Sequence, residues 1–173
     1  MHNVQILNLL MLRVYAFFLL LVFLFTEHIN AQNSDIVGVT SPEEIRSTHR
    51  IFDIYVDRYE PDSTALVYLS NYDEPIDFKI LFGTWCHDSK REVPAFIKTI
   101  ELANNSNFSV EYIGVNREKT DGKEFSKLYN LQYTPTFIIF KGSYEVGRIV
   151  EEVIKPIEIE LVEILKSGAF KDH

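Results

Sequence analysis

Alternating hydrophobic and polar residues predict β-strands in the second half of the chain. In residues 76–82, the side chains of Ile76, Phe78, Ile80 and Phe82 fall on one face of an extended segment. Further strands are predicted over residues 109–116, 136–140 and 145–150. The second of these is almost wholly apolar, which is typical of a strand buried on both faces. A turn at residues 142–143 makes the last two strands an antiparallel hairpin.

Between these strands, hydrophobic residues recur at the spacing of amphipathic helices. The clearest helix runs from Asp88 to about Asn104, and Pro94 inside it is expected to kink it. Other helices are predicted over residues 41–59, 61–72, 122–130 and 156–168, with a strand as the alternative for 61–72. Residues 32–40 read as a short mobile lead. Strands that alternate with helices predict an α/β domain with parallel pairing, to which the hairpin adds an antiparallel edge.

The N-terminal region has the order of a secretory signal peptide. Arg13 precedes an uncharged apolar run of twelve residues, 14–25, and small Ala31 follows before Gln32. The run is short for a helix that must cross a bilayer core of about 30 Å. We expect cleavage after Ala31 and a mature protein outside the cytoplasm, in the bacterial periplasm. An uncleaved membrane anchor is the alternative.

Composition limits the function classes. The 173 residues carry a net charge of −8, which argues against a nucleic-acid partner, because such proteins need a basic face. One cysteine excludes an internal disulfide and a cysteine-based metal cluster. No two of the five histidines have ligand spacing, so we expect no metal and no cofactor.

The single cysteine, Cys86, lies in the segment FGTWCHDSKREVP, where a predicted strand meets a predicted helix. A lone thiol in an exported protein is either inert or kept for its reactivity. The start of a helix stabilises a thiolate, and a protonated His87 would add to this effect while Asp88 would oppose it. Ser89, on the same helix face, has a hydroxyl suited to donate a hydrogen bond to the sulfur. A solvated loop position for His87 and a capping role for Ser89 are the structural alternatives.

Several of these features together resemble the thioredoxin family. They are Trp85-Cys86 at a strand-to-helix junction, Pro94 in the next helix, Thr134-Pro135 before a buried strand, and the closing hairpin. The resemblance covers about residues 76–167. It implies a three-layer α/β fold with a central mixed sheet of about four strands flanked by helices. The implied division is residues 1–31 as signal peptide, 32–75 as an N-terminal helical extension and 76–173 as the thioredoxin-like core.

The same resemblance assigns roles to individual residues. Trp85 would shield one side of the sulfur. Pro135 would follow a cis peptide bond beside Cys86, and the backbone of Thr134 would then be open to pairing with a substrate strand. Two positions depart from the family pattern: Ile80 replaces a buried acidic residue, and Ser89 replaces the second cysteine.

Without a second cysteine, a mixed disulfide on Cys86 must be released by another thiol. The first hypothesis is therefore an extracytoplasmic thiol–disulfide oxidoreductase or isomerase of the monothiol CxxS type. Its partners would be the thiols and disulfides of exported proteins, or small-molecule thiols. The second hypothesis is a non-catalytic binding module for exported proteins. A thiol peroxidase ranks last, because Gly83 stands three residues before Cys86 where that class usually has threonine.

Overall fold

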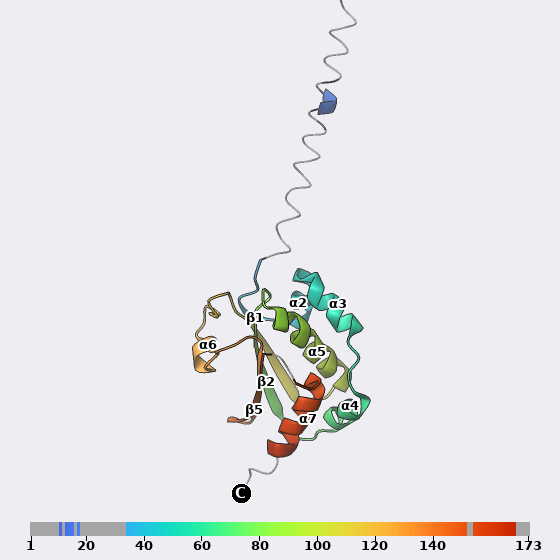
Figure 1. Ribbon diagram of the computed structural model, residues 1–173, viewed down its shortest axis with the longest axis vertical. Coiled ribbons are helices and arrows are strands. Elements are labelled where there is room, and N and C mark those ends of the chain that lie inside the picture. Colours follow the sequence, from blue (N-terminus) through green and yellow to red (C-terminus); the bar gives the residue numbers. More distant parts are fainter. Residues whose placement is uncertain (1–10, 12, 16, 18–33, 152–153, 169–173) are drawn as a thin grey trace, which may run out of the picture. The chain divides into compact units, whose positions relative to one another are not determined.

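A computed structural model describes residues 11, 13–15, 17, 34–151 and 154–168. The compact domain begins at Asp35 (Figure 1). The position of the predicted cleavage after Ala31 lies outside the described residues, so cleavage stays a prediction. In chain order the elements are β1 (Gly38–Thr40), α2 (Pro42–Thr48), α3 (Arg50–Arg58), α4 (Ser63–Ser70), β2 (Ile76–Phe82), α5 (His87–Ala103), β3 (Phe108–Gly114), α6 (Phe125–Leu128), β4 (Thr136–Lys141), β5 (Tyr144–Val150) and α7 (Ile157–Gly168).

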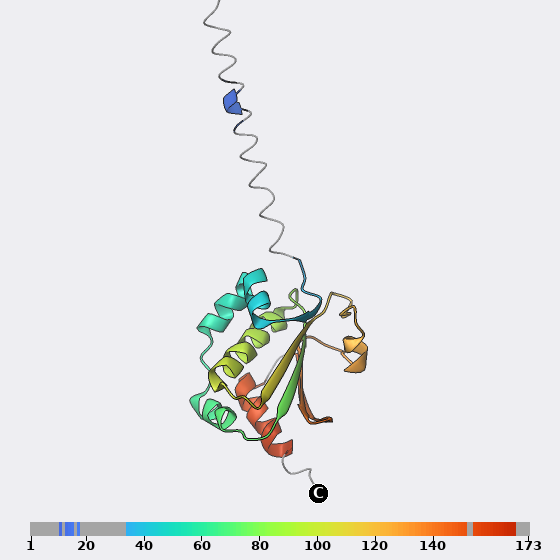
Figure 2. The same ribbon diagram turned by 180° about the vertical axis from the view of Figure 1, so that it is seen from behind.

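The strands form one mixed sheet in the order β1-β3-β2-β4-β5. Strands β2 and β3 are parallel, and every other neighbouring pair is antiparallel. Helices α2, α3, α4, α5 and α7 cover one face of the sheet, while α6 lies on the other, as Figures 1 and 2 both show. This is the predicted three-layer, thioredoxin-like α/β fold, with five strands instead of about four.

The alternation along β2 divides the core as predicted. Phe78, Ile80 and Phe82 are fully buried in the larger hydrophobic cluster, beneath the helices. Leu81 points to the opposite face, where it packs with Ile113 of β3 in a smaller cluster under α6. Because β2 has buried apolar side chains on both faces, it lies at the centre of the sheet. This burial also fixes the register of β2 and with it the position of its carboxyl end.

The segment predicted to be a mobile lead contains the fifth strand. Gly38 of β1 pairs with Gly114 of β3 in antiparallel register. Gly114 is required at this contact, because a Cβ atom there would lie 2.3 Å from the carbonyl oxygen of Ile36. A strand of three residues is too short for its alternation to be recognised in the sequence.

The expectation of parallel pairing is wrong for β4, which runs antiparallel to β2. The connection between β3 and β4 contains only the four-residue α6, too short to carry the chain back along the sheet. The chain therefore leaves β3 at Gly114, opposite Phe82, and enters β4 at Thr136, opposite Leu81. This reversal brings the residues before β4 to the same end of the sheet as the residues after β2.

The helical predictions hold with two changes. The helix expected over 122–130 is reduced to the four residues of α6. The helix expected over 41–59 is divided at His49, whose extended backbone separates α2 from α3. Ser41 caps α2 as predicted, since its hydroxyl accepts a hydrogen bond of 3.2 Å from the Glu44 amide. Residues 63–70 are helical, so the strand alternative there is wrong. Helix α5 continues through Pro94 without a break.

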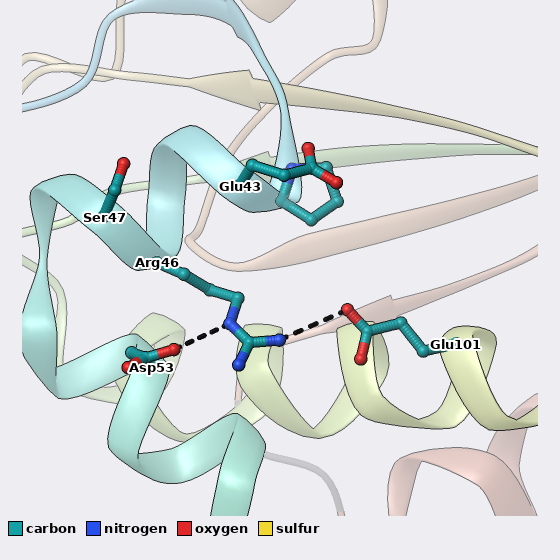
Figure 3. A pocket seen from close by; sticks show the side chains of 6 residues that line it. Glu43, Arg46, Ser47, Asp53 and Glu101 are labelled. Atoms are coloured by element: carbon teal, nitrogen blue, oxygen red, sulfur yellow. Dashed lines mark hydrogen bonds and ion pairs between the residues drawn. The ribbon is translucent and has the colours of Figure 1, made fainter.

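One side chain links three of the helices that cover the sheet. The Arg46 guanidinium of α2 bonds to Asp53 at 2.7 Å and Asp57 at 2.9 Å on α3, and lies 3.5 Å from Glu101 on α5. Figure 3 shows Arg46 reaching between Asp53 and Glu101, with Glu43 above it. The planar guanidinium is suited to such a role because it presents several donors in fixed directions. Arg46 thus joins α2 to α3 and α5.

We expect Arg46→Ala to lower the free energy of unfolding by about 1 kcal/mol at low salt, because three carboxylates lose their shared cation. At about 1 M salt the loss should shrink, since screening then acts over about 3 Å. Urea denaturation at the two salt concentrations measures both effects. Arg50→Ala is the matched control: Arg50 is exposed on α3 and makes no ion pair within the described residues. Equal losses in the two variants would contradict the linking role of Arg46.

Candidate functional site

Cys86 lies at the N-cap of α5, directly after the turn that follows β2. The Cys86 amide donates to the Gly83 carbonyl at 3.0 Å, which closes the turn, and the Cys86 carbonyl accepts from the Lys90 amide at 3.2 Å, which begins the helix. The side chain is partly exposed. The strand-turn-helix junction expected from the sequence is therefore present, with the sulfur at the positive end of the helix dipole.

The sulfur contacts the segment that precedes β4. The Cys86 thiol donates a hydrogen bond of 3.1 Å to the Thr134 carbonyl oxygen, and the Thr134–Pro135 peptide bond is cis. Two further bonds fix this segment: the Thr136 hydroxyl donates to the Tyr133 carbonyl at 2.7 Å, and the Glu151 amide donates to the Pro135 carbonyl at 2.8 Å. The structure thus brings together the cysteine and the Thr-Pro pair that the sequence singled out.

The side chain of Trp85 packs on the turn that precedes Cys86. Its indole N–H donates to the Val115 carbonyl at 3.0 Å, and the side chain is half-buried. The ring packs so closely on Gly83 that a Cβ atom there would lie 2.5 Å from it, which explains the need for glycine. The guanidinium of Arg117 lies over the ring, 5.7 Å from its centroid.

Ser89 faces the interior. It is fully buried, and its hydroxyl accepts a hydrogen bond of 3.3 Å from the Gly83 amide. Among the described residues, this hydroxyl is thus engaged with the turn instead of with the Cys86 sulfur. His87, the first residue of α5, is exposed. Of the sequence candidates, Trp85, Thr134 and Pro135 surround Cys86, Ser89 supports the turn beneath it, and His87 points to solvent.

Glu92, one turn after Asp88 on α5, is a buried carboxylate. A charged side chain usually lies in solvent, but Glu92 is only 3% exposed. It is paired with Arg91, whose Nε lies 2.5 Å from the Glu92 carboxylate and whose Nη2 lies 3.5 Å from Asp88. Arg91 is therefore engaged by carboxylates of its own helix. The helical spacing gave no sign of this, because the burying surface comes from elsewhere in the chain.

Sequence reasoning also missed the residues that line the site from the N-terminal lead and from the β3–α6 connection. Asp35 accepts a hydrogen bond of 3.0 Å from the Thr84 hydroxyl, in the turn before Cys86. Arg117 and Lys119 lie in the connection and contact the rings of Trp85 and Tyr133. Both segments lack a periodic pattern, so nothing in the sequence brings them to Cys86.

Comparison with known proteins yields structural likeness alone. No family model and no curated protein sequence matches the chain. The germline-specific thioredoxin Deadhead of Drosophila melanogaster is 16% identical with a TM-score of 0.42, over 54% of this chain and 81% of that one. Thioredoxin f2 of Chlamydomonas reinhardtii is 15% identical with a TM-score of 0.42, over 58% and 85%. The thioredoxin pre-protein of Schistosoma mansoni is 23% identical with a TM-score of 0.41, over 64% and 94%.

Within the described residues, no three side chains of the His, Cys, Asp or Glu type are placed to hold a metal ion. No helix in the same part of the chain is long and apolar enough to cross a membrane.

Buried Asp121 anchors the connection that carries the Thr134–Pro135 segment. One carboxylate oxygen accepts from the amide and hydroxyl of Ser126, at 3.1 and 2.9 Å. The other accepts from the amides of Lys123 and Phe125, at 3.2 and 3.1 Å. Burial acts to raise the pKa of Asp121, but the bonds from Ser126 and Phe125 outweigh it and hold the pKa below its ordinary value of 3.8.

We expect Asp121→Asn to lower the free energy of unfolding by about 1–3 kcal/mol at neutral pH, because one amide oxygen cannot serve four donors. A carboxyl whose pKa is lower in the folded than in the unfolded protein stabilises the fold above its unfolded pKa. The difference in the free energy of unfolding between the wild type and Asp121→Asn should therefore shrink as the pH falls below the ordinary pKa of a carboxyl group. Urea denaturation at about pH 7 and about pH 3 measures it.

Glu124→Gln is the matched control, because Glu124 is an exposed carboxylate in the same connection whose one ion-pair partner among the described residues is exposed Lys127. The free energy of unfolding of Glu124→Gln should be close to that of the wild type at both pH values. A difference for Asp121→Asn that is equally large in acid would contradict the role given to the ionised carboxylate.

Proposed function

We propose that this protein is an extracytoplasmic thiol–disulfide exchange protein that works with one thiol, Cys86. The observation that carries the proposal is the hydrogen bond between the Cys86 thiol and the Thr134 carbonyl, at the N-terminus of α5. It holds a partly exposed sulfur beside a backbone segment next to which a substrate strand can lie. The extracytoplasmic location rests on the signal-like order of residues 1–31.

The exchange reaction begins with a mixed disulfide on Cys86 and can end by either of two routes. The Cys86 thiolate attacks one sulfur of a substrate disulfide, so that a Cys86–substrate disulfide forms and the other substrate sulfur leaves as a thiolate. In isomerisation, a thiolate of the substrate then attacks the substrate sulfur of that mixed disulfide, which forms a new substrate disulfide and releases Cys86 as a thiolate. In net reduction, a small-molecule thiolate attacks the Cys86 sulfur instead, so that the substrate leaves as a thiolate and Cys86 carries the small thiol. A second small-molecule thiolate then attacks the sulfur of that bound small thiol, which forms the small-molecule disulfide and releases Cys86 as a thiolate.

The position of Ser89 supports a reaction with one protein thiol. A hydroxyl does not displace a thiolate from a disulfide under ordinary conditions, because the thiolate is the nucleophile in exchange. The Ser89 hydroxyl is also buried and bonded to the Gly83 amide. Release of a substrate from Cys86 thus depends on a thiol from outside the protein.

The alternative function is a binding module in which Cys86 takes no part in turnover. The single cysteine of the chain is the observation that favours it, because no second thiol of the protein can release a substrate bound to Cys86. The two functions differ in what happens when Cys86 is replaced.

An aromatic disulfide that releases a coloured thiolate separates the possibilities. The wild-type protein should release one equivalent and remain as a mixed disulfide, which mass spectrometry detects. Ser89→Cys places a second sulfur one helical turn from Cys86, within the Cα separation that a disulfide spans. That variant should release two equivalents and keep no adduct, since the introduced thiol displaces the first product.

Cys86→Ser is the control and should release no thiolate. A folded wild-type protein that reacts no faster than its urea-unfolded form would overturn the exchange function. In that case, capture of an exported protein by both the wild type and Cys86→Ser would support the binding module.

A further inference from the structure

The connection after β3 forms a fixed loop beside Cys86, made of residues 115–120. Its closure depends on Asn116, whose amide and side-chain oxygen bond to the backbone of Thr120 at 3.0 and 2.9 Å. The Asn116 carbonyl also accepts from the Lys119 amide at 2.9 Å. At its start, the Val115 amide donates to the Phe82 carbonyl at 2.8 Å, which ties the loop to the end of β2. The side chains of this loop are therefore presented from a defined backbone.

This loop places two cations at the candidate site. The Arg117 guanidinium lies over the ring of Trp85, the residue before Cys86. The Lys119 ammonium lies 5.2 Å from the ring centroid of Tyr133 and donates to the Gln132 carbonyl at 2.6 Å. Tyr133 directly precedes Thr134, whose carbonyl accepts the Cys86 thiol proton. Each cation is thus held on an aromatic residue that adjoins one of the two partners of the sulfur contact.

The nearby carboxylates do not neutralise these cations. Among the described residues, neither Arg117 nor Lys119 forms an ion pair, whereas Asp88 is paired with Arg91. Asp35 accepts a hydrogen bond from Thr84, and exposed Glu118 is the one acidic residue of the loop. The loop therefore carries a net charge of 2 − 1 = +1 in a chain whose net charge is −8.

We propose that Arg117 and Lys119 make Cys86 selective for disulfides whose flanking groups carry carboxylates. The inference rests on the proposed exchange function and names the substrate class for it. A cation that lies over an aromatic ring keeps N–H groups directed to solvent, and these can bind a carboxylate. The carboxylate can belong to a small-molecule disulfide or to an acidic segment of an exported protein, because the recognition chemistry is the same.

The expected effect is moderate and depends on salt. Two cations near the reacting sulfur should favour an anionic over a neutral disulfide by roughly three- to tenfold in rate at low ionic strength. The ratio of the two rates should fall toward one at about 0.5 M salt, where charges interact over only a few Å.

The test measures second-order rate constants for Cys86 with three disulfides: anionic oxidised glutathione, cationic cystamine and neutral dithiodipyridine. For each variant, the rate constant with glutathione disulfide is divided by that with dithiodipyridine to give the anionic ratio, and the rate constant with cystamine is divided in the same way to give the cationic ratio. These ratios remove differences in the intrinsic reactivity of Cys86 between protein variants. We expect Arg117→Gln/Lys119→Gln to lower the anionic ratio by roughly three- to tenfold and to raise the cationic ratio. A peptide disulfide flanked by aspartates, compared with one flanked by lysines, extends the same measurement to a protein source.

The matched control is Lys98→Gln/Lys166→Gln, which changes the net charge equally but away from the site. Lys98 lies about 18 Å further along α5 than Cys86 by the helix rise. Lys166 lies against Tyr68 of α4, and α4 is bonded to Asn105 beyond the far end of α5. This control should leave both ratios unchanged.

Three outcomes decide the matter. Ratios that change only in Arg117→Gln/Lys119→Gln support the inference, and the glutathione and peptide arms then identify which source gains most. Equal ratios in that variant and the wild type overturn the inference but leave exchange at Cys86 intact. A folded Cys86 that reacts with none of the reagents faster than the unfolded chain overturns the exchange function and this inference with it.

Discussion

The antiparallel pairing of β4 with β2 is the constraint on which the candidate site depends. Cys86 and Thr134 are 48 residues apart in the chain, and their contact exists because β4 starts at the end of the sheet where β2 stops. A parallel β4 would place the Thr-Pro segment at the opposite end, a full strand length away. The short α6 makes the antiparallel direction possible, since the connection stays at one end of the sheet. The contact between Cys86 and Thr134 therefore depends first on the topology of the sheet and only then on the chemistry of the side chains.

On that scaffold, backbone hydrogen bonds close the turn that positions Cys86. The turn before Cys86 is closed by Gly83, which also accommodates the Trp85 ring and donates to Ser89. A buried serine at this position has a structural consequence of its own. Its hydroxyl satisfies an amide that would otherwise be buried without an acceptor, which would destabilise the fold by about 1–3 kcal/mol. The Ser89 hydroxyl is thus part of the turn that positions Cys86.

Much of this could be predicted from the sequence, for physical reasons that differ from element to element. Strand β2 and helices α5 and α7 have strong periodic patterns, and their burial follows from the pattern. The direction of β4 depends on how the connection packs, which periodicity does not encode. The burial of Glu92 escaped prediction as well, because a helix face is solvated or covered according to what other segments supply. The motif residues of the site were found because two short motifs, Trp85-Cys86 and Thr134-Pro135, resemble those of a known family. Asp35 and Arg117 belong to no motif and reach the site only through the fold.

Local charge and net charge have different roles in this protein. A net charge of −8 keeps the whole molecule repulsive to anions at long range, yet screening limits that field to about 10 Å at 0.1 M salt. Within such a distance of the sulfur, the field is set by the few groups that line the site. Asp88 and Glu92 are both paired with Arg91, which offsets one of their two negative charges. Arg117 and Lys119 form no ion pair among the described residues, and their fixed loop lets a small positive charge act against the acidic background. A short, closed loop next to a lone thiol is therefore enough to give the site a charge preference that composition alone would place in the opposite direction.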